Sequence, residues 1–507
     1  MGGKLAKQSI FVTIILFIGY IISFVKETVV ANYFGVSAEV DAYTVAITIP
    51  VNLFAIIALA IQPIVIPIYS NLRINRSEEQ ANAYICSLIS IIGAISFAFI
   101  VLFEILASPI AYLFAPGLEQ ETHQLVVSLL RITLPTVFFT LLDRVLVGVM
   151  NVHKQFVLPS LSVYFLNLSV IVMIVFLHSA YGITAACFGQ VVGAVLQILF
   201  LAFFARKYIH FSFRLNFRDE SIKETGRNVI PVIWSTSVAE LDAIINRAVA
   251  SFLFVGAISS LGYATKVNTV LMTFFTSAIA TIVYPLYAEA SAKNDLAQLN
   301  SRVNTTLSIY AFLLLPLVFG ILCLKRELII VAFARGAFDA DAVDLTQSLL
   351  GCYCLGILFL AFRETITKVY YALHDTMTPA KNTTFGLIIN IVLNLTLPFF
   401  LGVQGLALAT SISAAFMAIG LLYQLTQKYD EINLGMTMKE IAKMMLPVAV
   451  MALFIMVLKL ITDFSPIVTL LAGFVSGSII YILVSYLLKI NAFMYLMSSV
   501  FKGIIKK

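Results

Sequence analysis

The chain has 507 residues, of which 61% are apolar and only 11% are charged, and its mean hydropathy is +1.00. Soluble domains carry about 25% charged residues, so this composition excludes an ordinary soluble protein. The apolar residues form stretches of about 20 or more, the length that a helix needs to cross a hydrocarbon core of roughly 30 Å. Because unpaired backbone groups are too unfavourable in lipid, we predict an all-α polytopic membrane protein.

The first 24 residues are basic and then apolar, without an A-x-A cleavage site, which predicts a retained first helix. Five cysteines (86, 187, 323, 352 and 354) lie in apolar segments, and their spacing fits no zinc site, so we interpret them as core residues. The sequence contains no Walker A motif, catalytic triad, HExxH or dinucleotide glycine pattern. We therefore expect a protein that is not an enzyme and binds no cofactor or metal. Any transport would draw on the membrane potential, the gradient of the cargo, or an ion that the sequence does not identify.

Apolar runs between polar breaks predict fourteen spans. They lie near 9–31, 43–69, 83–107, 125–151, 156–177, 181–204, 229–254, 261–287, 303–323, 344–362, 383–401, 405–426, 441–460 and 466–488. With the N-terminus in the cytoplasm, the inside segments carry 23 Lys and Arg residues. The outside segments carry four, namely Lys325, Arg326, Arg335 and Lys459. This bias predicts that both termini are cytoplasmic. The net charge of +6 is then a sign of topology and gives no support to a nucleic-acid partner.

Residues 205–228 form the longest polar stretch, in which aromatic and basic residues alternate. One interpretation is an interfacial linker at the level of the lipid headgroups, and the other is a segment that contacts anionic lipid.

Short words recur along the chain at an offset near 220. Four pairs carry this pattern: Phe114–Gly117 with Phe333–Gly336, Pro159 with Pro379, Tyr181–Ala186 with Gln404–Ala409 at an offset of 223, and Ala31–Gly35 with Ala250–Gly256. We predict two parallel six-helix lobes, an N-lobe (1–204) and a C-lobe (229–428), with a linker (205–228) between them. Two further helices and a tail (429–507) follow. Bundles repeated in this way bind cargo between them and rock between inward-open and outward-open states.

Five cations lie inside predicted spans, and three of them, Lys26, Arg247 and Lys266, are candidates for a site. A charge in hydrocarbon costs at least about 2.5–3.5 kcal/mol, so retained charges indicate function. Lys26 and Arg247 are separated by an offset of 221, within the register of the repeat. The three cations either form a site for an anion or pair with nearby carboxylates. Glu27 points about 100° away from Lys26 on a helix, so we predict that it is a poor partner.

Other residues are candidates for a cavity or a gate. Glu240 and Asp242 precede Arg247 by seven and five positions, outside the favoured i, i+4 spacing. Arg363 and Lys368 lie at the inner end of the tenth span, before a loop that is either a cytoplasmic turn or an element through which substrate enters. Prolines 50, 63 and 67 interrupt the second span, where they favour bending.

Several of these words occur together in one known family. The segments Lys26-Glu27-x-Val29-Val30-Ala31-x-x-Phe34-Gly35, Asp41-Ala42-Tyr43, Phe114-Ala-Pro-Gly117 and Tyr370-Tyr-Ala-Leu-x-Asp-x-x-Thr-Pro379 resemble those of the MurJ/MviN proteins. These proteins are lipid II flippases of the multidrug/oligosaccharidyl-lipid/polysaccharide exporter superfamily. The resemblance covers essentially the whole chain. It implies two six-helix lobes, a central cationic cavity, and two further helices that form a groove for the lipid tail.

The resemblance also implies roles for particular residues. The family's pair of arginines in the first span falls on Tyr20 and Lys26, and its arginine in the eighth span falls on Lys266. The second-span arginine has no cationic counterpart, since Asn52 is the only polar residue between Val51 and Ile61. Asp41 matches the family's acidic residue after the first span. The implied pyrophosphate-binding residues are Lys26, Arg247 and Lys266.

The resemblance implies a bacterial plasma-membrane protein that moves lipid-linked peptidoglycan precursor from the inner to the outer leaflet by alternating access. Its partners would be this lipid, the surrounding membrane lipids and proteins of cell-wall synthesis. Alternatives are a flippase for another lipid-linked oligosaccharide, which the missing second-span arginine favours, a cation-coupled drug exporter, and a scaffold that does not transport.

Overall fold

The computed structural model describes residues 2–505, and the side chains in that range except those of residues 2–10, 52, 53, 55, 231, 234–240, 274–282 and 499–505. The described residues form helices and no strand, which confirms the all-α prediction. Ten of these helical segments are long and apolar enough to cross a membrane, or eleven if a pair bent by 41° counts as one span. The predicted number of fourteen therefore stays a prediction.

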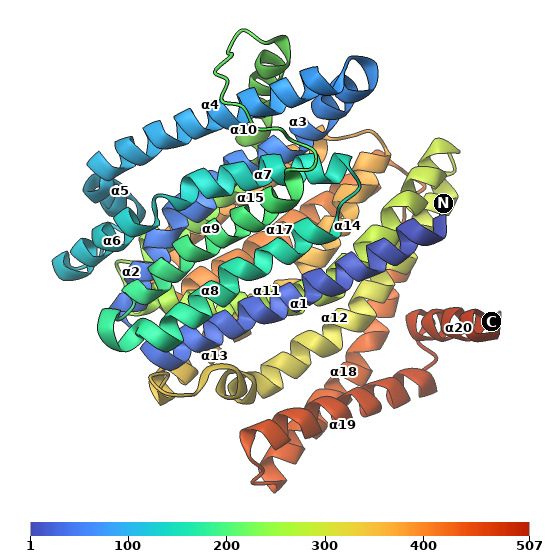
Figure 1. Ribbon diagram of the computed structural model, residues 1–507. Helices are drawn as coiled ribbons and strands as arrows, with labels where there is room; N and C mark the ends of the chain where they lie inside the picture. Colours follow the sequence, from blue (N-terminus) through green and yellow to red (C-terminus); the bar gives the residue numbers. More distant parts are fainter. Residues whose placement is uncertain (1, 506–507) are drawn as a thin grey trace. The chain divides into compact units, whose positions relative to one another are not determined.

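The chain divides into two units, residues 1–259 with 336–338, and residues 260–335 with 339–507. The first contains α1 (Gly2–Phe34), α2 (Ala38–Ile47), the π-helix η1 (Thr48–Leu53), α3 (Phe54–Asn75), α4 (Glu78–Ile105), α5 (Ala107–Phe114), α6 (Gln120–Thr133), α7 (Thr136–Val152), α8 (Val157–Tyr181), α9 (Thr184–Ala205), α10 (Glu220–Ala250) and the start of α11 (Ala257–Ala292). The second contains the rest of α11 and α12 (Leu296–Phe333), α13 (Ala340–Cys354), α14 (Ile357–Ala372), α15 (Met377–Thr396), α16 (Pro398–Leu401), α17 (Val403–Lys428), α18 (Gly435–Ile461), α19 (Pro466–Leu487) and α20 (Asn491–Ile505) (Figure 1).

The second predicted span, which three prolines interrupt in the sequence, is a continuous helical run from α2 through η1 to α3. Pro50 lies in η1, a single π-helical stretch between α2 and α3, whereas Pro63 and Pro67 lie inside the continuous helix α3. A proline lacks the N–H that closes the helical ladder, and a π-turn is a common way to accommodate the interruption. The π-helical stretch therefore lies at the first of the three prolines, and the bending that they favour stays a prediction.

Matching turns in the two halves support the internal repeat. Gly182 and Gly402 end helices with nearly the same backbone angles, φ 54° and ψ −139° in one and φ 57° and ψ −142° in the other. Lys154 and His374 both have positive φ, at 61° and 59°. Both pairs are related by an offset of 220, so the offset of 223 proposed for the segment after Gly182 is wrong. A match of short apolar words misled the prediction there, because backbone conformation and not side-chain identity marks the equivalent turn.

Glycines bring α8 and α9 into close contact. A Cβ at Gly189 would lie 2.5 Å from the Cα of Val170, and one at Gly193 would lie 2.8 Å from the Cα of Leu166. Small residues that let backbones approach are the usual means of packing helices in lipid, where no hydrophobic effect drives them together.

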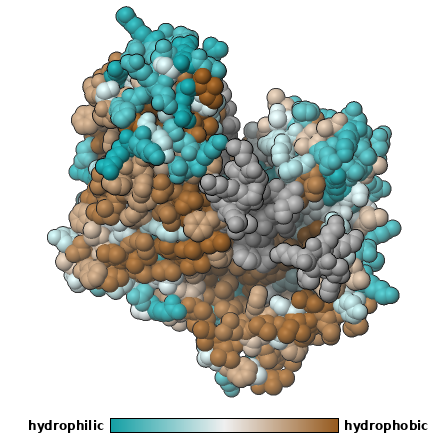
Figure 2. Space-filling view, turned by 45° about the vertical axis from the view of Figure 1, so that its right-hand side comes forward, coloured by the Kyte–Doolittle hydropathy of each residue, from teal (hydrophilic) through white to brown (hydrophobic). Residues whose placement is uncertain are grey.

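Hydrophobic residues cover much of the exposed face in Figure 2, and hydrophilic residues gather towards its upper edge. Large apolar side chains with high exposure include Phe399 and Leu460, each 86% exposed. Such a surface would be unfavourable in water, and it suits a chain whose helices are surrounded by lipid.

Candidate functional site

Lys26 lies within α1, in a segment long and apolar enough to span the membrane. Its side chain is only 12% exposed, and its Nζ lies 2.9 Å from Oε1 of Glu27. The prediction that Glu27 is a poor partner is therefore wrong. The two Cβ atoms diverge on the helix, but both side chains are long enough to bend towards each other. The attraction between their charges is stronger in the low-dielectric surroundings than in water.

Tyr43 of α2 is a polar residue of this region that the sequence did not single out. It is only 2% exposed, its hydroxyl is buried without a hydrogen-bond partner, and it interacts electrostatically with Lys26. Buried hydroxyl groups normally form a hydrogen bond, so one without a hydrogen-bond partner indicates a strained or functional position. The sequence feature that could have indicated Tyr43 is its place in the segment Asp41-Ala42-Tyr43, which carries part of the family resemblance.

Arg247 lies in the last turn of α10, where it donates to the carbonyl oxygen of Ala243 at 3.5 Å. One turn earlier, Asp242 accepts a hydrogen bond from Asn246 Nδ2 at 3.4 Å, and its other carboxylate oxygen is buried without a partner. Asp242 thus has one carboxylate oxygen that can accept a further hydrogen bond.

Of four further predicted cavity residues, two have side chains that the structure describes and two do not. Tyr20 is 45% exposed on α1, and Lys266 is half-buried on the part of α11 that belongs to the second unit. The side chains of Asn52 and Glu240 lie outside the described residues. Convergence of Lys26, Arg247 and Lys266 on one anion therefore remains a prediction.

Two repeat-related contacts lie at the end of α1 far from the N-terminus, and we call them the loop clasp. Gly117 donates its N–H to Ser251 Oγ at 2.9 Å, and Ala337 donates its N–H to the carbonyl oxygen of Asn32 at 2.8 Å. An offset of 219 relates Asn32 to Ser251, and the same offset relates Gly117 to Gly336. Each Phe-Ala-x-Gly loop therefore donates a hydrogen bond to the end of the first helix of the other repeat. The loop at Gly117 contacts the end of α10, and the loop at Gly336 contacts the end of α1.

Glycine is required at both loops of the clasp. A Cβ at Gly117 would lie 2.6 Å from backbone atoms of Ser251 and Phe252. Gly336 has φ +57°, and its Cβ would lie 2.2 Å from the carbonyl oxygen of Asn32. The words that revealed the repeat in the sequence are thus explained by close backbone approach.

Asp41 reinforces the clasp from α2. It is 1% exposed, and its two carboxylate oxygens accept the N–H groups of Gly256 and Ser259, each at 2.7 Å. These N–H groups belong to the start of α11, where the helix dipole favours a negative charge. Asp41 therefore fastens α2 to the first turn of α11.

The predicted gate residues of the second unit make local contacts. Arg363 donates to Thr383 Oγ1 at 3.1 Å, and Lys368 pairs with Glu364 at 2.9 Å. The segment between α14 and α15 is short, residues 373–376, and both interpretations of it, a cytoplasmic turn and an element through which substrate enters, stay predictions.

Asp375 organises this turn. It accepts from the N–H and hydroxyl of Thr378 at 3.0 and 2.7 Å, and from Lys428 Nζ at 2.7 Å. The hydrogen bond from Lys428, followed by that from the Thr378 N–H, holds the pKa of Asp375 well below its usual range.

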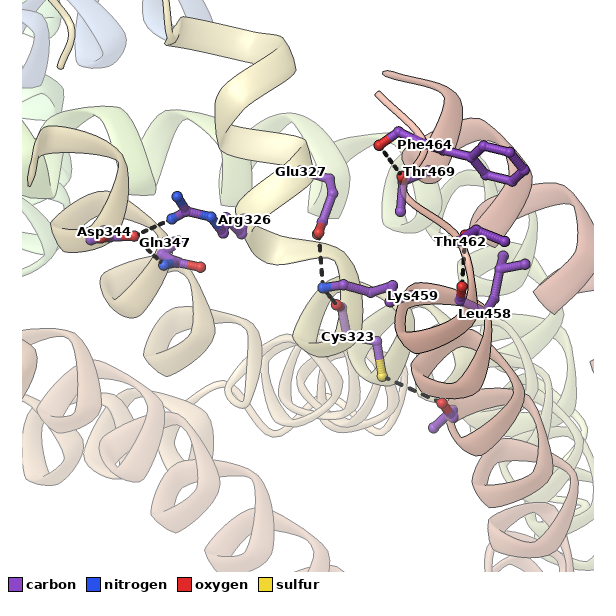
Figure 3. Close-up of polar contacts among 11 residues, drawn as sticks. Cys323, Arg326, Glu327, Asp344, Gln347, Leu458, Lys459, Thr462, Phe464 and Thr469 are labelled. Carbon is purple, nitrogen blue, oxygen red and sulfur yellow. Dashed lines mark hydrogen bonds and ion pairs between the residues drawn. The ribbon is translucent and has the colours of Figure 1, made fainter. Parts of the chain in front are cut away.

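A second lysine–glutamate ion pair lies in the second unit, and the sequence pattern did not reveal it. Lys459 Nζ is 2.9 Å from Oε1 of Glu327 and donates to the carbonyl oxygen of Cys323 at 2.9 Å (Figure 3). Lys459, which the hydropathy pattern assigns to an outside segment, lies inside α18, two residues before its end. The pair joins α18 to α12.

Comparison with known proteins gives the same picture along nearly the whole chain. Residues 30–475 match the family model described as lipid II flippase MurJ. Proteins named probable lipid II flippase MurJ are 28% identical over 462 residues in Rickettsia prowazekii, covering 90% of each chain, and 26% identical over 486 residues in Thermotoga maritima, covering 96% of this chain and 97% of that one.

Solved structures agree. The structure titled lipid II flippase MurJ, inward closed conformation, covers 98% of this chain and 100% of its own, with a TM-score of 0.78 and 25% identity. An inward-facing multidrug resistance transporter of the MATE family covers 81% of this chain and 94% of its own, with a TM-score of 0.67 and 16% identity, and so shares the fold. The family match over residues 30–475 identifies the chain as a member of the lipid II flippase MurJ family.

Proposed function

We propose that the protein flips lipid II, an undecaprenyl-pyrophosphate-linked peptidoglycan precursor, across the bacterial plasma membrane. The observation that carries this proposal is the family match over residues 30–475, together with relatives and a solved flippase that align along nearly their full length. No described feature favours another lipid-linked oligosaccharide or a drug as the cargo.

The pyrophosphate would bind Lys26, Arg247 and Lys266. Lys26 is paired with Glu27 at 2.9 Å, so this pair is close to neutral before the cargo arrives, which lowers the cost of holding Lys26 among apolar helices. An arriving pyrophosphate would replace Glu27 as the partner of Lys26. The vacant hydroxyl of Tyr43 would supply a further donor to a phosphate oxygen.

Alternating access would require the loop clasp to open. The clasp and Asp41 fasten α1, α2, α10 and the start of α11 at the end of α1 far from the N-terminus. With both termini in the cytoplasm, as the lysine and arginine bias predicts, this end faces the outer leaflet. The described contacts would then close the outward exit, and their release would let the headgroup leave.

The membrane potential would assist this direction of transport. Moving one negative charge outward across an inside-negative membrane is favourable by about 2.3 kcal/mol per 100 mV, if the charge crosses the full field. A pyrophosphate carries more than one such charge, so a cationic site that releases it outward could work without ATP.

The test is rescue of bacteria depleted of their own lipid II flippase. We expect the wild-type chain to restore growth, and Lys26→Ala/Lys266→Ala to fail while lipid II accumulates in the inner leaflet. The matched control, Lys439→Ala/Lys489→Ala, removes two exposed lysines elsewhere and should rescue. Growth with the first double variant at wild-type protein levels would exclude the cationic site. Failure of the wild-type chain to rescue would exclude lipid II as the cargo.

A further inference from the structure

The segment between α9 and α10 lies extended against α4, and we call its residues 209–217 the interfacial strip. Figure 1 shows this segment as the thin green trace crossing α4. At its start, Asn82 of α4 makes a reciprocal pair with His210. The Asn82 amide donates to the His210 carbonyl oxygen, and the His210 N–H donates to the Asn82 side-chain oxygen, both at 2.9 Å.

Residues on the next two turns of α4 also accept hydrogen bonds from the strip. The N–H of Ser212 donates to Cys86 Sγ at 3.4 Å, and the N–H of Arg214 donates to Ser90 Oγ at 3.2 Å. Asn82, Cys86 and Ser90 recur at every fourth position, so they lie on one face of α4 and span about 12 Å along its axis. The strip is therefore held straight along a helix that can cross the membrane.

The outward edge of the strip is apolar. Successive side chains of an extended segment point to opposite sides, so residues 211, 213 and 215 share one side, and Phe217 lies in the turn that follows. All four are large and exposed: Phe211 (61%), Phe213 (72%), Leu215 (48%) and Phe217 (59%). Four exposed side chains of this size form a patch that is unfavourable in water and favourable against lipid.

The position along α4 sets the depth of the strip. The 28 residues of α4 are about 42 Å long, close to the thickness of a bilayer that includes its headgroups. Asn82 lies one turn from the start of this helix, and Ser90 lies about 12 Å deeper. The strip thus begins among the headgroups and ends at the outer part of the hydrocarbon, where interfacial segments insert.

Exposed cations flank the apolar edge. Arg206, Lys207, Arg214 and Arg218 are all exposed, and none of them forms an ion pair with another described residue. The Arg206 guanidinium lies 4.0 Å above the ring of Phe203. The nearest carboxylate along the chain, Asp219, already accepts the N–H of Ser221 at 2.8 Å as the cap of α10. The positive charge beside the aromatic edge is therefore available to anions.

We propose that the interfacial strip binds anionic phospholipid of the leaflet it enters. The phenylalanines insert beside the acyl chains, and Arg214 and Arg218 hold the headgroup phosphates. This site is separate from the transport of lipid II, and the alternative, contact with lipid irrespective of charge, is an outcome of the test. Each arginine is expected to contribute about fivefold to the preference for anionic over zwitterionic lipid.

The test uses the full chain in vesicles with one reporter tryptophan. Trp234 is the chain's single tryptophan, so Trp234→Phe/Phe213→Trp places the only indole on the strip. In vesicles of brominated phosphatidylcholine we expect strong quenching and little effect of aqueous iodide. In mixtures of brominated phosphatidylglycerol with unlabelled phosphatidylcholine, quenching should exceed that expected from the bulk composition by a preference of fivefold or more.

Matched variants separate charge from contact. Arg214→Gln/Arg218→Gln in the reporter background should bring the preference close to one, and Lys439→Gln/Lys489→Gln, with the same change of charge elsewhere, should leave it unchanged. Iodide quenching with no effect of brominated lipid would overturn the insertion, and an initial preference near one would overturn the recognition of charge. If Phe213→Trp disturbs folding, Phe217→Trp, which reports from the end of the strip, replaces it.

Discussion

At the scale of residues, the two lysine–glutamate pairs differ in what they can do. Lys26 and Glu27 are neighbours on one helix, so their pair can break without any helix moving. Lys459 and Glu327 lie on different helices, so their pair holds α18 against α12. The first arrangement suits a site that exchanges partners, and the second suits a fixed joint.

Loss of Lys459 should weaken this joint. Lys459→Met leaves the buried Glu327 carboxylate without its cation, and one of its oxygens already lacks a hydrogen-bond partner. Removing one member of a buried pair lowers the free energy of unfolding by about 3–5 kcal/mol. Denaturation in detergent should show this loss, and Lys459→Met/Glu327→Met should recover most of it. Equal stability of the single variant and the wild type would mean that the pair contributes nothing.

Removal of the counterion should strengthen binding at Lys26. Glu27→Gln keeps the shape of the side chain and leaves Lys26 without its anionic partner, so the pyrophosphate no longer competes with a carboxylate. We expect lipid II to bind about tenfold more tightly, equivalent to about 1.4 kcal/mol, and to be released more slowly. Titration of the purified protein with lipid II measures the affinity, with Glu39→Gln as an exposed control. Weaker binding by Glu27→Gln would contradict the exchange of partners.

Asp375 should make stability depend on pH. Its pKa is held below the usual value in the folded protein, so its contribution is present above about pH 4 and is lost as the pH falls through its folded pKa. Since Lys428 is half exposed and screened, the contact with Thr378 should dominate, at about 1 kcal/mol. Melting temperatures at pH 7, 5 and 3 should fall below pH 4 for the wild type. Asp375→Ala should be less stable at pH 7 and lose less between pH 5 and 3, and an unchanged pH response in this variant would exclude the role.

At the scale of elements, hydropathy predicted where helices lie better than where they end. The spans predicted at 156–177 and 181–204 correspond to α8 and α9 within a few residues. The span predicted at 303–323 lies inside α12, which has 38 residues. Its polar flanks end the apolar signal but not the helix, because Asn, Arg, Lys and Glu are tolerated in helices that leave the hydrocarbon.

Single residues of the candidate site were recognisable in the sequence, but their contacts were not. Lys26 was recognisable because charges are rare in such segments, and Asp41 through its place in the family motif. The partners of both depend on rotamers and on approaches between segments far apart in the sequence, as between Asp41 and Ser259, which no local pattern encodes. Tyr43 was missed for the same reason, since a buried hydroxyl without a partner shows itself only once its surroundings are known.

Close packing of α8 on α9 predicts opposite outcomes for two glycines. Gly189→Ala places a Cβ 2.5 Å from the Cα of Val170 and must push the helices apart, at a cost of about 1–3 kcal/mol in unfolding free energy. Gly226 of α10 meets nothing within 4 Å, so Gly226→Ala should be neutral or stabilise by up to about 1 kcal/mol. Parallel denaturation curves compare the two. Equal losses in both variants would show that Gly189 has no packing role.

At the scale of the whole molecule, the loop clasp follows the internal repeat and is also the contact that the proposed transport cycle must open. Two contacts that the repeat relates close one end of α1 and of α10, with their acceptor residues 219 and their donor residues 220 positions apart. Asp41 adds a third contact that the repeat does not account for. Few and short hydrogen-bonded contacts of this kind, each contributing about 1 kcal/mol, can be released in a transport cycle. The close approach of backbone atoms at both loops also explains why glycines mark the repeat there.

A covalent lock at the clasp should stop transport reversibly. The Ala337 N–H lies 2.8 Å from the Asn32 carbonyl oxygen, which places the two residues within the range that a disulfide can bridge. Asn32→Cys/Ala337→Cys should therefore cross-link under mild oxidation, and we expect flipping of lipid II in vesicles to fall at least tenfold and to return with reductant. Each single cysteine variant, treated in the same way, should keep its activity, since the five native cysteines are buried or half-buried and unpaired. Undiminished flipping by the fully cross-linked protein would show that the clasp stays closed throughout the cycle and that the headgroup leaves by another route.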